Sequence, residues 1–235
     1  MKYALLVAAT ALGLSVTAAP VAFAGDQDTS EAARIAHGGQ LYDKWWKTLK
    51  VSEPTGTHTA YPADAAKSGS ATWRCKECHG WDYIGAEGRY SSGSHFTGIP
   101  GIQSMAGGDT TEIAAAIRGE PHNLGPDMIN DSALADLALF VSKGQFDVVS
   151  FLDEGKSTGD PVLGKAAYQT VCAGCHGLDG RKITEMPPMG ELAGNAPEMM
   201  HKIMNGQPTE TMPAMRIFGP QLAADIVAYV ATLPK

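Results

Sequence analysis

The sequence predicts an all-α protein of two tandem domains, and three repeated features support this fold class. The pattern C-x-x-C-H occurs twice, at residues 75–79 and 172–176, and these two motifs contain all four cysteines of the 235-residue chain. A helical pattern with glycine and tyrosine four residues apart precedes each motif. A second apolar helix follows each motif, so each half has the same order of parts.

The C-x-x-C-H pattern is typical of covalent c-type haem attachment. Two thiols one helical turn apart can form thioethers with the two vinyl groups of a porphyrin, and the following histidine then lies under the iron. We therefore expect two covalently attached haem c groups. The predicted attachment residues are Cys75, Cys78, Cys172 and Cys175, and the predicted proximal iron ligands are His79 and His176.

Two other functions of C-x-x-C pairs are weighed against haem. One pair can act as a redox dithiol, and two pairs can assemble one four-thiolate zinc site. Neither explains why a histidine directly follows both pairs. Haem attachment also leaves no cysteine for a disulfide.

The first 24 residues have the pattern of a secretory signal. Lys2 supplies the positive end, residues 3–19 are apolar and small, and residues 22–24 read Ala-Phe-Ala before the predicted cleavage. An uncleaved membrane anchor is the alternative. No later stretch is long and apolar enough to span a bilayer. We expect export to the periplasm and no intrinsic membrane span in the mature chain.

Length and charge set further limits. After removal of the signal, the chain suits two domains of about 100 residues each. The formal net charge of −7 argues against nucleic acid and anionic membranes as partners and is compatible with a partner that presents lysines. The predicted division is a signal peptide at 1–24, a first domain at 25–145, a linker at 146–159 and a second domain at 160–235.

In the first domain, a helix is expected from Thr29 or Ser30, with a kink or close packing at Gly38-Gly39. Residues 50–74 are predicted to be a loop, and residues 79–109 a glycine-rich segment that can wrap a flat apolar cofactor. Thr110 or Thr111 is expected to cap a helix ending at Arg118, and residues 131–132 to cap the closing helix.

In the second domain, Asp160-Pro161 is a typical helix start, and the final helix is expected over 220–233. The repeat pairs Gly38 and Tyr42 with Gly164 and Tyr168. Tyr168 precedes its cysteine motif by 4 residues and Tyr42 by 33, so the first domain carries about 29 extra residues there.

This order of parts resembles the class I cytochrome c fold in tandem, as in two-haem cytochromes c. The resemblance is close over residues 160–235, whereas the insertion and the glycine-rich segment of the first half depart from the compact type. In that family the first and last helices cross near a glycine and an aromatic residue. Gly38 or Gly39 with Phe140, and Gly164 with Tyr229, match those positions.

The resemblance also implies the distal ligands of the two irons. A methionine directly before proline points to Met212 in the second domain, with Met215 as the alternative. Met128 lies just before the closing helix of the first domain, where the family places its ligand. His122 is the alternative there and would give a bis-histidine haem of lower potential. Met105, His95 and an open or water-bound iron are further alternatives.

Two coordinatively saturated irons predict an electron carrier rather than an enzyme. We expect single-electron transfer between redox proteins in a respiratory or photosynthetic-type chain, free or within a membrane oxidoreductase complex. The alternative is a haem enzyme acting on sulfur or nitrogen oxyanions, with one catalytic and one electron-transfer haem. Residues 81–83, Trp-Asp-Tyr, are interpreted as haem packing or as a docking surface.

Overall fold

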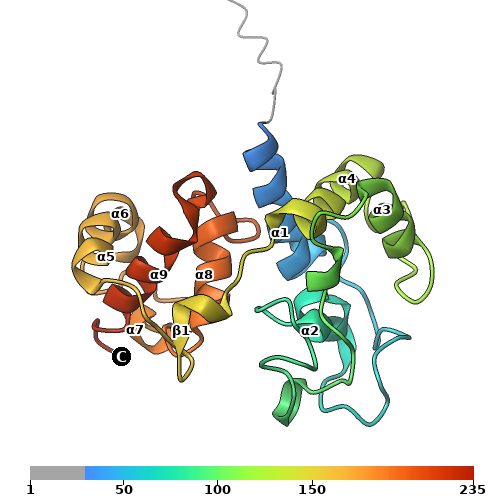
Figure 1. Ribbon diagram of the computed structural model, residues 1–235, viewed down its shortest axis with the longest axis horizontal. Coiled ribbons are helices and arrows are strands. Elements are labelled where there is room, and N and C mark those ends of the chain that lie inside the picture. Colours follow the sequence, from blue (N-terminus) through green and yellow to red (C-terminus); the bar gives the residue numbers. More distant parts are fainter. Residues whose placement is uncertain (1–29) are drawn as a thin grey trace, which may run out of the picture.

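The computed structural model describes residues 30–235, so the predicted signal peptide lies outside the described residues. Two helical lobes stand side by side (Figure 1). We call residues 30–144 the N-terminal lobe, residues 161–235 the C-terminal lobe, and residues 145–160 the connecting segment. Among residues 30–235, no helix combines the length and the apolar character that crossing a bilayer requires.

Four α-helices and several shorter turns build the N-terminal lobe. The helix α1 packs against α4 and its extension, and α3 packs against α4. Residues 140–144 continue α4 as one π-helical turn. The bounds are α1 (Glu31–Thr48), α2 (Cys75–His79), α3 (Thr110–Arg118) and α4 (Asp131–Leu139), with short 3₁₀ helices at Gly69–Trp73, Gly93–His95 and Gln103–Met105.

Helix α1 begins where the sequence predicts. The Ser30 side chain accepts a hydrogen bond from the Ala33 amide, which caps the helix. Of the two outcomes expected at Gly38-Gly39, close packing is the observed one. The kink in α1 instead lies at Lys44, whose φ of −157° and ψ of 79° are not helical.

The caps of α3 and α4 lie one residue earlier than predicted. The Asp109 carboxylate accepts from the amides of Thr111 and Glu112, and the Asn130 side chain accepts from the Ala133 amide. A cap is the residue whose side chain reaches the second or third helical amide. The predicted Thr110 and Asp131 are therefore the first helical residues.

The connecting segment contains the two strands found in the described residues. Strand β1 (Leu152–Asp153) pairs antiparallel with β2 (Lys156–Ser157) in a short hairpin. The C-terminal lobe follows with α5 (Pro161–Ala167), α6 (Ala173–His176), α7 (Met189–Leu192), α8 (Ala196–Asn205) and α9 (Gly219–Val230). Asp160 caps α5 as predicted, with its carboxylate accepting from two amides. The final helix ends at Val230, three residues before the predicted end at 233.

The same helix crossing occurs in both lobes. In the N-terminal lobe, Gly38 of α1 lies against the backbone carbonyl of Asp136 in α4. In the C-terminal lobe, Gly164 of α5 lies against the backbone carbonyl of Asp225 in α9. A side chain at either glycine would collide with the opposite helix, so the crossing requires glycine.

Each lobe also ties this crossing to its cysteine motif by a tyrosine. The Tyr42 hydroxyl donates to the carbonyl of Gly80 at 2.6 Å, and the Tyr168 hydroxyl donates to the carbonyl of Gly177 at 2.8 Å. Both acceptors directly follow the motif histidine, and both have φ of +81°, the left-handed region that favours glycine.

A buried histidine joins the two lobes. His201 of α8 is fully buried, with ring centroids 5.7 Å from Tyr42, 5.0 Å from Trp81 and 5.6 Å from Phe140 of the N-terminal lobe. Its Nε2 donates to the carbonyl of Gly39 at 2.9 Å, which leaves Nδ1 to accept from the Tyr83 hydroxyl at 2.9 Å.

Ion pairs surround this contact. The buried Asp43 carboxylate of α1 pairs with Arg74 and, at 2.9 Å, with Lys202 of α8. Burial alone would raise the pKa of Asp43, but these two cations outweigh it and lower the pKa to about 2.

Residues 81–83 form part of this interface between the lobes. Trp81 is 4% exposed, Asp82 1% and Tyr83 0%. The docking-surface interpretation is therefore wrong: His201 of the C-terminal lobe packs on Trp81 and Tyr83, and Asp82 accepts from the amides of Ile84 and Arg89 within its own lobe.

Candidate haem sites

A cavity of about 380 Å³ lies beside the first cysteine motif. Its volume is in the range of small-molecule and cofactor sites, about 300–1,000 Å³. The insertion contributes residues 58–74, the glycine-rich segment contributes residues 99–105, and α3 with the loop after it contributes residues 113–124. Both departures from the compact cytochrome plan therefore form walls of this cavity. Its titratable or sulfur-bearing lining residues are Tyr42, His58, Arg74, Cys75, Cys78, His79, Met105 and His122.

Helix α2 brings Cys75, Cys78 and His79 to one wall. Both thiols line the cavity, and burial raises the pKa of each to about 12. They are therefore protonated at neutral pH. The second motif lies in the other lobe, and within residues 30–235 no three His, Cys, Asp or Glu side chains converge as a metal ion would need.

His79 is fixed in the orientation that an iron ligand needs. Its Nδ1 donates to the backbone carbonyl of Pro100 at 2.8 Å, so Nε2 carries the lone pair. Burial keeps the pKa of His79 below its usual range, which favours the neutral imidazole. The glycine-rich segment thus supplies the residue that orients this histidine, a role that the sequence alone did not assign to Pro100.

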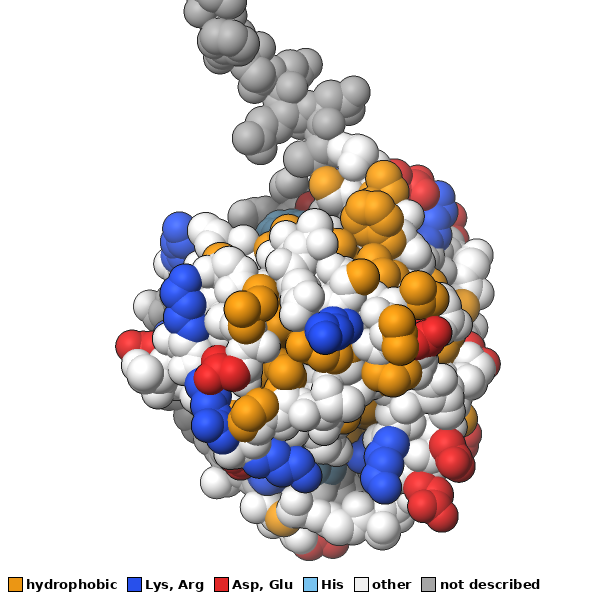
Figure 2. All heavy atoms as spheres, turned by 90° about the vertical axis from the view of Figure 1, so that its left-hand side faces the viewer, with side chains coloured by type: hydrophobic (Ala, Val, Ile, Leu, Met, Phe, Trp, Pro, Cys, Tyr) orange, Lys and Arg blue, Asp and Glu red, His pale blue; other side chains and the backbone are white. Residues whose placement is uncertain are grey.

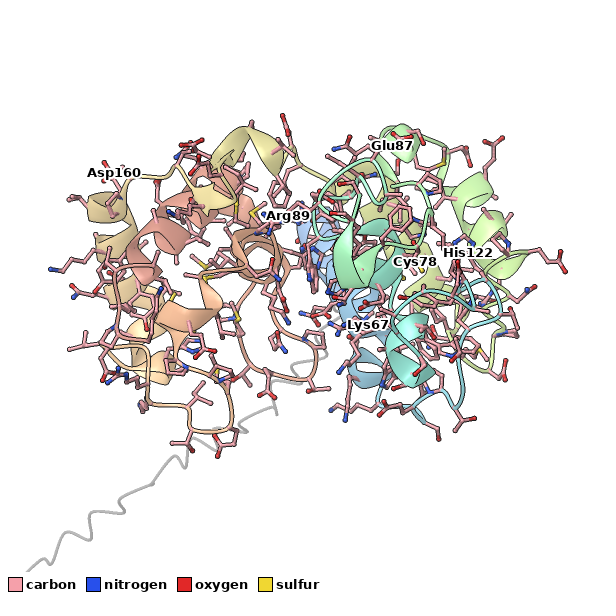
Figure 3. The ribbon with its side chains drawn as sticks, turned by 90° about the horizontal axis from the view of Figure 1, so that it is seen from below. Lys67, Cys78, Glu87, Arg89, His122 and Asp160 are labelled. Atoms are coloured by element: carbon pink, nitrogen blue, oxygen red, sulfur yellow. The ribbon has the colours of Figure 1, made fainter. Side chains whose placement is uncertain are left out.

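His122 lies across the cavity from His79. The two ring centroids are 6.0 Å apart with an interplanar angle of 40°. Figure 3 shows His122 beside Cys78, and both residues line the cavity. Nδ1 of His122 donates to the Ala116 carbonyl at 3.0 Å, which leaves its Nε2 with a lone pair as well.

The other predicted ligands of the first centre lie elsewhere or are exposed. Met128 is half-buried against the apolar core and is not among the residues that line the cavity. Met105 lines the cavity, but its side chain is 44% exposed. His95 hydrogen-bonds through Nδ1 to the Glu77 carboxylate at 2.7 Å and also lies outside the lining.

The sequence analysis did not identify His58 as part of the first site. Its Nε2 donates to the backbone carbonyl of His122 at 3.0 Å, which fixes the position of that residue. His58 also contacts Trp73, with ring centroids 4.4 Å apart. The insertion already distinguished the first half from the second. A histidine within it was the signal that could have indicated a role for His58 in the first site.

The second motif lies in a more open setting. Cys172 is half-buried, and burial raises its pKa to about 11, whereas Cys175 is exposed. His176 has a buried Nδ1 with no hydrogen-bond partner among the described residues. His176 therefore lacks the orienting hydrogen bond that His79 makes to the Pro100 carbonyl.

The two candidate methionines of the C-terminal lobe both pack against its apolar core. Met212 is half-buried in the loop after α8, and Met215 is 8% exposed. Figure 2 shows the face of this lobe that points away from the N-terminal lobe, where apolar side chains lie among basic and acidic ones. Large exposed apolar residues of this lobe are Val162, Leu163, Val171, Leu178, Leu192, Ile217 and Phe218.

Comparison with known families agrees with this geometry in the C-terminal lobe. Residues 159–230 match the family model described as cytochrome c oxidase, cbb3-type, subunit III. The match spans α5 to α9 and includes the second cysteine motif and Met212. This part of the chain is therefore a c-type cytochrome domain, which implies covalent haem c and electron transfer. No curated protein matches the chain in the corresponding search.

Proposed function

We propose that this protein is an exported dihaem c-type cytochrome, built from two tandem cytochrome c-like domains, that carries single electrons between redox proteins. The observation that carries the proposal is the repeated anchor in the two lobes. Glycine of the first helix, tyrosine four residues later and the glycine after C-x-x-C-H make equivalent contacts in both. Because the C-terminal lobe is a cytochrome domain, the same anchor supports the same cofactor in the N-terminal lobe.

The residues divide into attachment and axial roles. Cys75 and Cys78 attach one haem, with His79 as proximal ligand. Cys172 and Cys175 attach the other, with His176 as proximal ligand and Met212 as distal ligand. When bound, each haem supplies a one-electron redox couple. The protein orients His79 through the Pro100 carbonyl and holds the two lobes together through His201.

The surface of the C-terminal lobe fits contact with a redox partner. Cys175 is exposed, so the second motif is accessible from the surface of this lobe. The partner is a redox protein, free in the periplasm or part of a membrane oxidoreductase complex.

Mass spectrometry and the alkaline pyridine spectrum of the purified, matured protein test the proposal. We expect loss of residues 1–24, two covalent haems per chain and uptake of two electrons in a reductive titration. One haem per chain would overturn the dihaem assignment. Turnover of thiosulfate, peroxide or nitrite by the purified protein alone would replace the carrier with an enzyme.

A further inference from the structure

We propose that His122, not Met128, is the distal ligand of the first haem iron, and that electrons pass from the N-terminal lobe to the C-terminal lobe. This inference rests on the proposed dihaem function. It departs from the methionine that the cytochrome resemblance implies, and its evidence is the geometry of the first cavity.

The first step is the distance between the two imidazoles. A metal–imidazole bond is about 2 Å long and the ring centre lies about 1 Å beyond the nitrogen, so two rings on opposite sides of one metal have centroids about 6 Å apart. His79 and His122 are separated by 6.0 Å. Both rings also line the cavity into which Cys75 and Cys78 face.

The second step is the matching tautomer of the two rings. His79 donates Nδ1–H to the Pro100 carbonyl, and His122 donates Nδ1–H to the Ala116 carbonyl. A backbone carbonyl on Nδ1 is the usual outer partner of a metal-bound histidine, because it fixes the ring and leaves Nε2 to bind. A histidine that served only packing would not need the same arrangement.

The third step is the anchoring of the loop that carries His122. The His122 carbonyl accepts from His58 at 3.0 Å, and the Asn123 amide donates to the Gly119 carbonyl at 2.8 Å. The Leu124 amide donates to the Ile117 carbonyl at 3.3 Å. The ring is thus held from α3 and from the insertion, so its position does not depend on the exposed side of the loop.

The competing methionines lack these properties. The Met128 side chain is half-buried against the apolar core and is absent from the cavity lining. Met105 reaches the cavity but is largely exposed on a short 3₁₀ helix. Neither has an orienting contact comparable to that of His122.

The ligand assignment determines the direction of electron transfer. A methionine ligand raises the haem potential relative to a second histidine. With His79 and His122 at the first iron, and His176 and Met212 at the second, the first centre has the lower potential. With haem bound, the second centre would be the better electron acceptor, so the donor would contact the N-terminal lobe and the acceptor the C-terminal lobe.

Spectroscopy of the intact holoprotein tests the ligand. The ferric wild-type protein should show one methionine–iron charge-transfer band per two haems, and two separated one-electron steps in a redox titration. His122→Ala should open one iron, so that the reduced variant binds one carbon monoxide per chain. His122→Met should add a second methionine–iron band and move the lower step toward the higher one. Met128→Leu is the matched control, because Met128 lies outside the cavity lining, and it should leave the spectrum unchanged.

Each result has a defined meaning. Two methionine–iron bands in the wild-type protein, loss of a band in Met128→Leu or Met105→Leu, or an unchanged spectrum in His122→Ala would overturn the assignment. If His122→Ala fails to mature, the wild-type band count decides alone. The haem count is independent: one covalent haem per chain refutes the dihaem function, whereas two haems with two methionine ligands refute only the role of His122.

Discussion

The two lobes share one anchoring scheme but surround it differently. In both, a glycine–carbonyl crossing and a tyrosine hydrogen bond hold the segment that follows C-x-x-C-H. The N-terminal lobe adds the insertion and the glycine-rich segment, which form a cavity with two histidines facing each other. The C-terminal lobe lacks both additions and leaves Cys175 exposed. The helix crossing and the tyrosine hydrogen bond are therefore constant, while the surrounding segments change how far each cysteine motif is enclosed.

Removing either pair of cysteines should have the largest effect. Cys75→Ser/Cys78→Ser and Cys172→Ser/Cys175→Ser should each leave one covalent haem, because serine forms no thioether. We expect greater loss of stability for the first variant, since its empty cavity is enclosed by two long loops that the cofactor would order. Haem content and urea unfolding measure both effects. Equal loss of stability in the two variants would contradict the proposal that the first motif is more enclosed than the second.

The interface between the lobes should weaken in acid through His201. Burial lowers the pKa of His201 to about 4. The unfolded chain, with a histidine pKa of about 6.5, binds more protons between these values, so stability falls as pH drops from 6.5 toward 4, by about 3 kcal/mol. Above pH 6.5, His201 is neutral in both the folded and the unfolded chain, so this loss of stability is absent.

His201→Gln keeps a donor for the Gly39 carbonyl but does not titrate. Urea unfolding of the wild type and this variant between pH 7 and about 4.5 isolates the effect, because the other histidines are common to both. Parallel stability curves would show that His201 is not protonated on unfolding.

The glycines at the two crossings should be equally intolerant of a side chain. In Gly38→Ala and Gly164→Ala, the new Cβ meets the rigid backbone of Asp136 or Asp225. Overpacking of this kind costs about 1–3 kcal/mol. Gly174→Ala is the control, because its Cβ would have no heavy atom within 4 Å. If only one of the two variants lost stability, the two helix crossings would not be equivalent.

The tyrosine anchors should show the smallest effect and a measurable difference between the lobes. Tyr42→Phe and Tyr168→Phe each leave a glycine carbonyl without its donor, at a cost of about 1–2 kcal/mol. Tyr42→Phe should lower the free energy of unfolding more than Tyr168→Phe, because the hydrogen bond of Tyr42 is fully buried and that of Tyr168 is only partly buried. Thermal unfolding of both variants checks the order.

Sequence reasoning predicted the local features and missed most contacts between segments distant in the chain. The helix starts at Ser30 and Asp160 followed from capping residues, which act within one turn. The role of residues 81–83 could not be predicted, because an apolar cluster does not indicate what covers it. His201 resembles any other helical residue until Tyr83 and Gly39 of the other lobe are brought against it.

The sequence by itself determined the helical class, the two cysteine motifs and the repeat, because each depends on residues close in the chain. Only the tertiary structure placed His122 opposite His79, 43 residues away (122 minus 79). It did so through Pro100, Ala116 and His58, whose backbone and side-chain contacts fix both rings. Whether two histidines can bind one metal depends on their distance and orientation in space. The number of residues between them in the chain gives neither quantity.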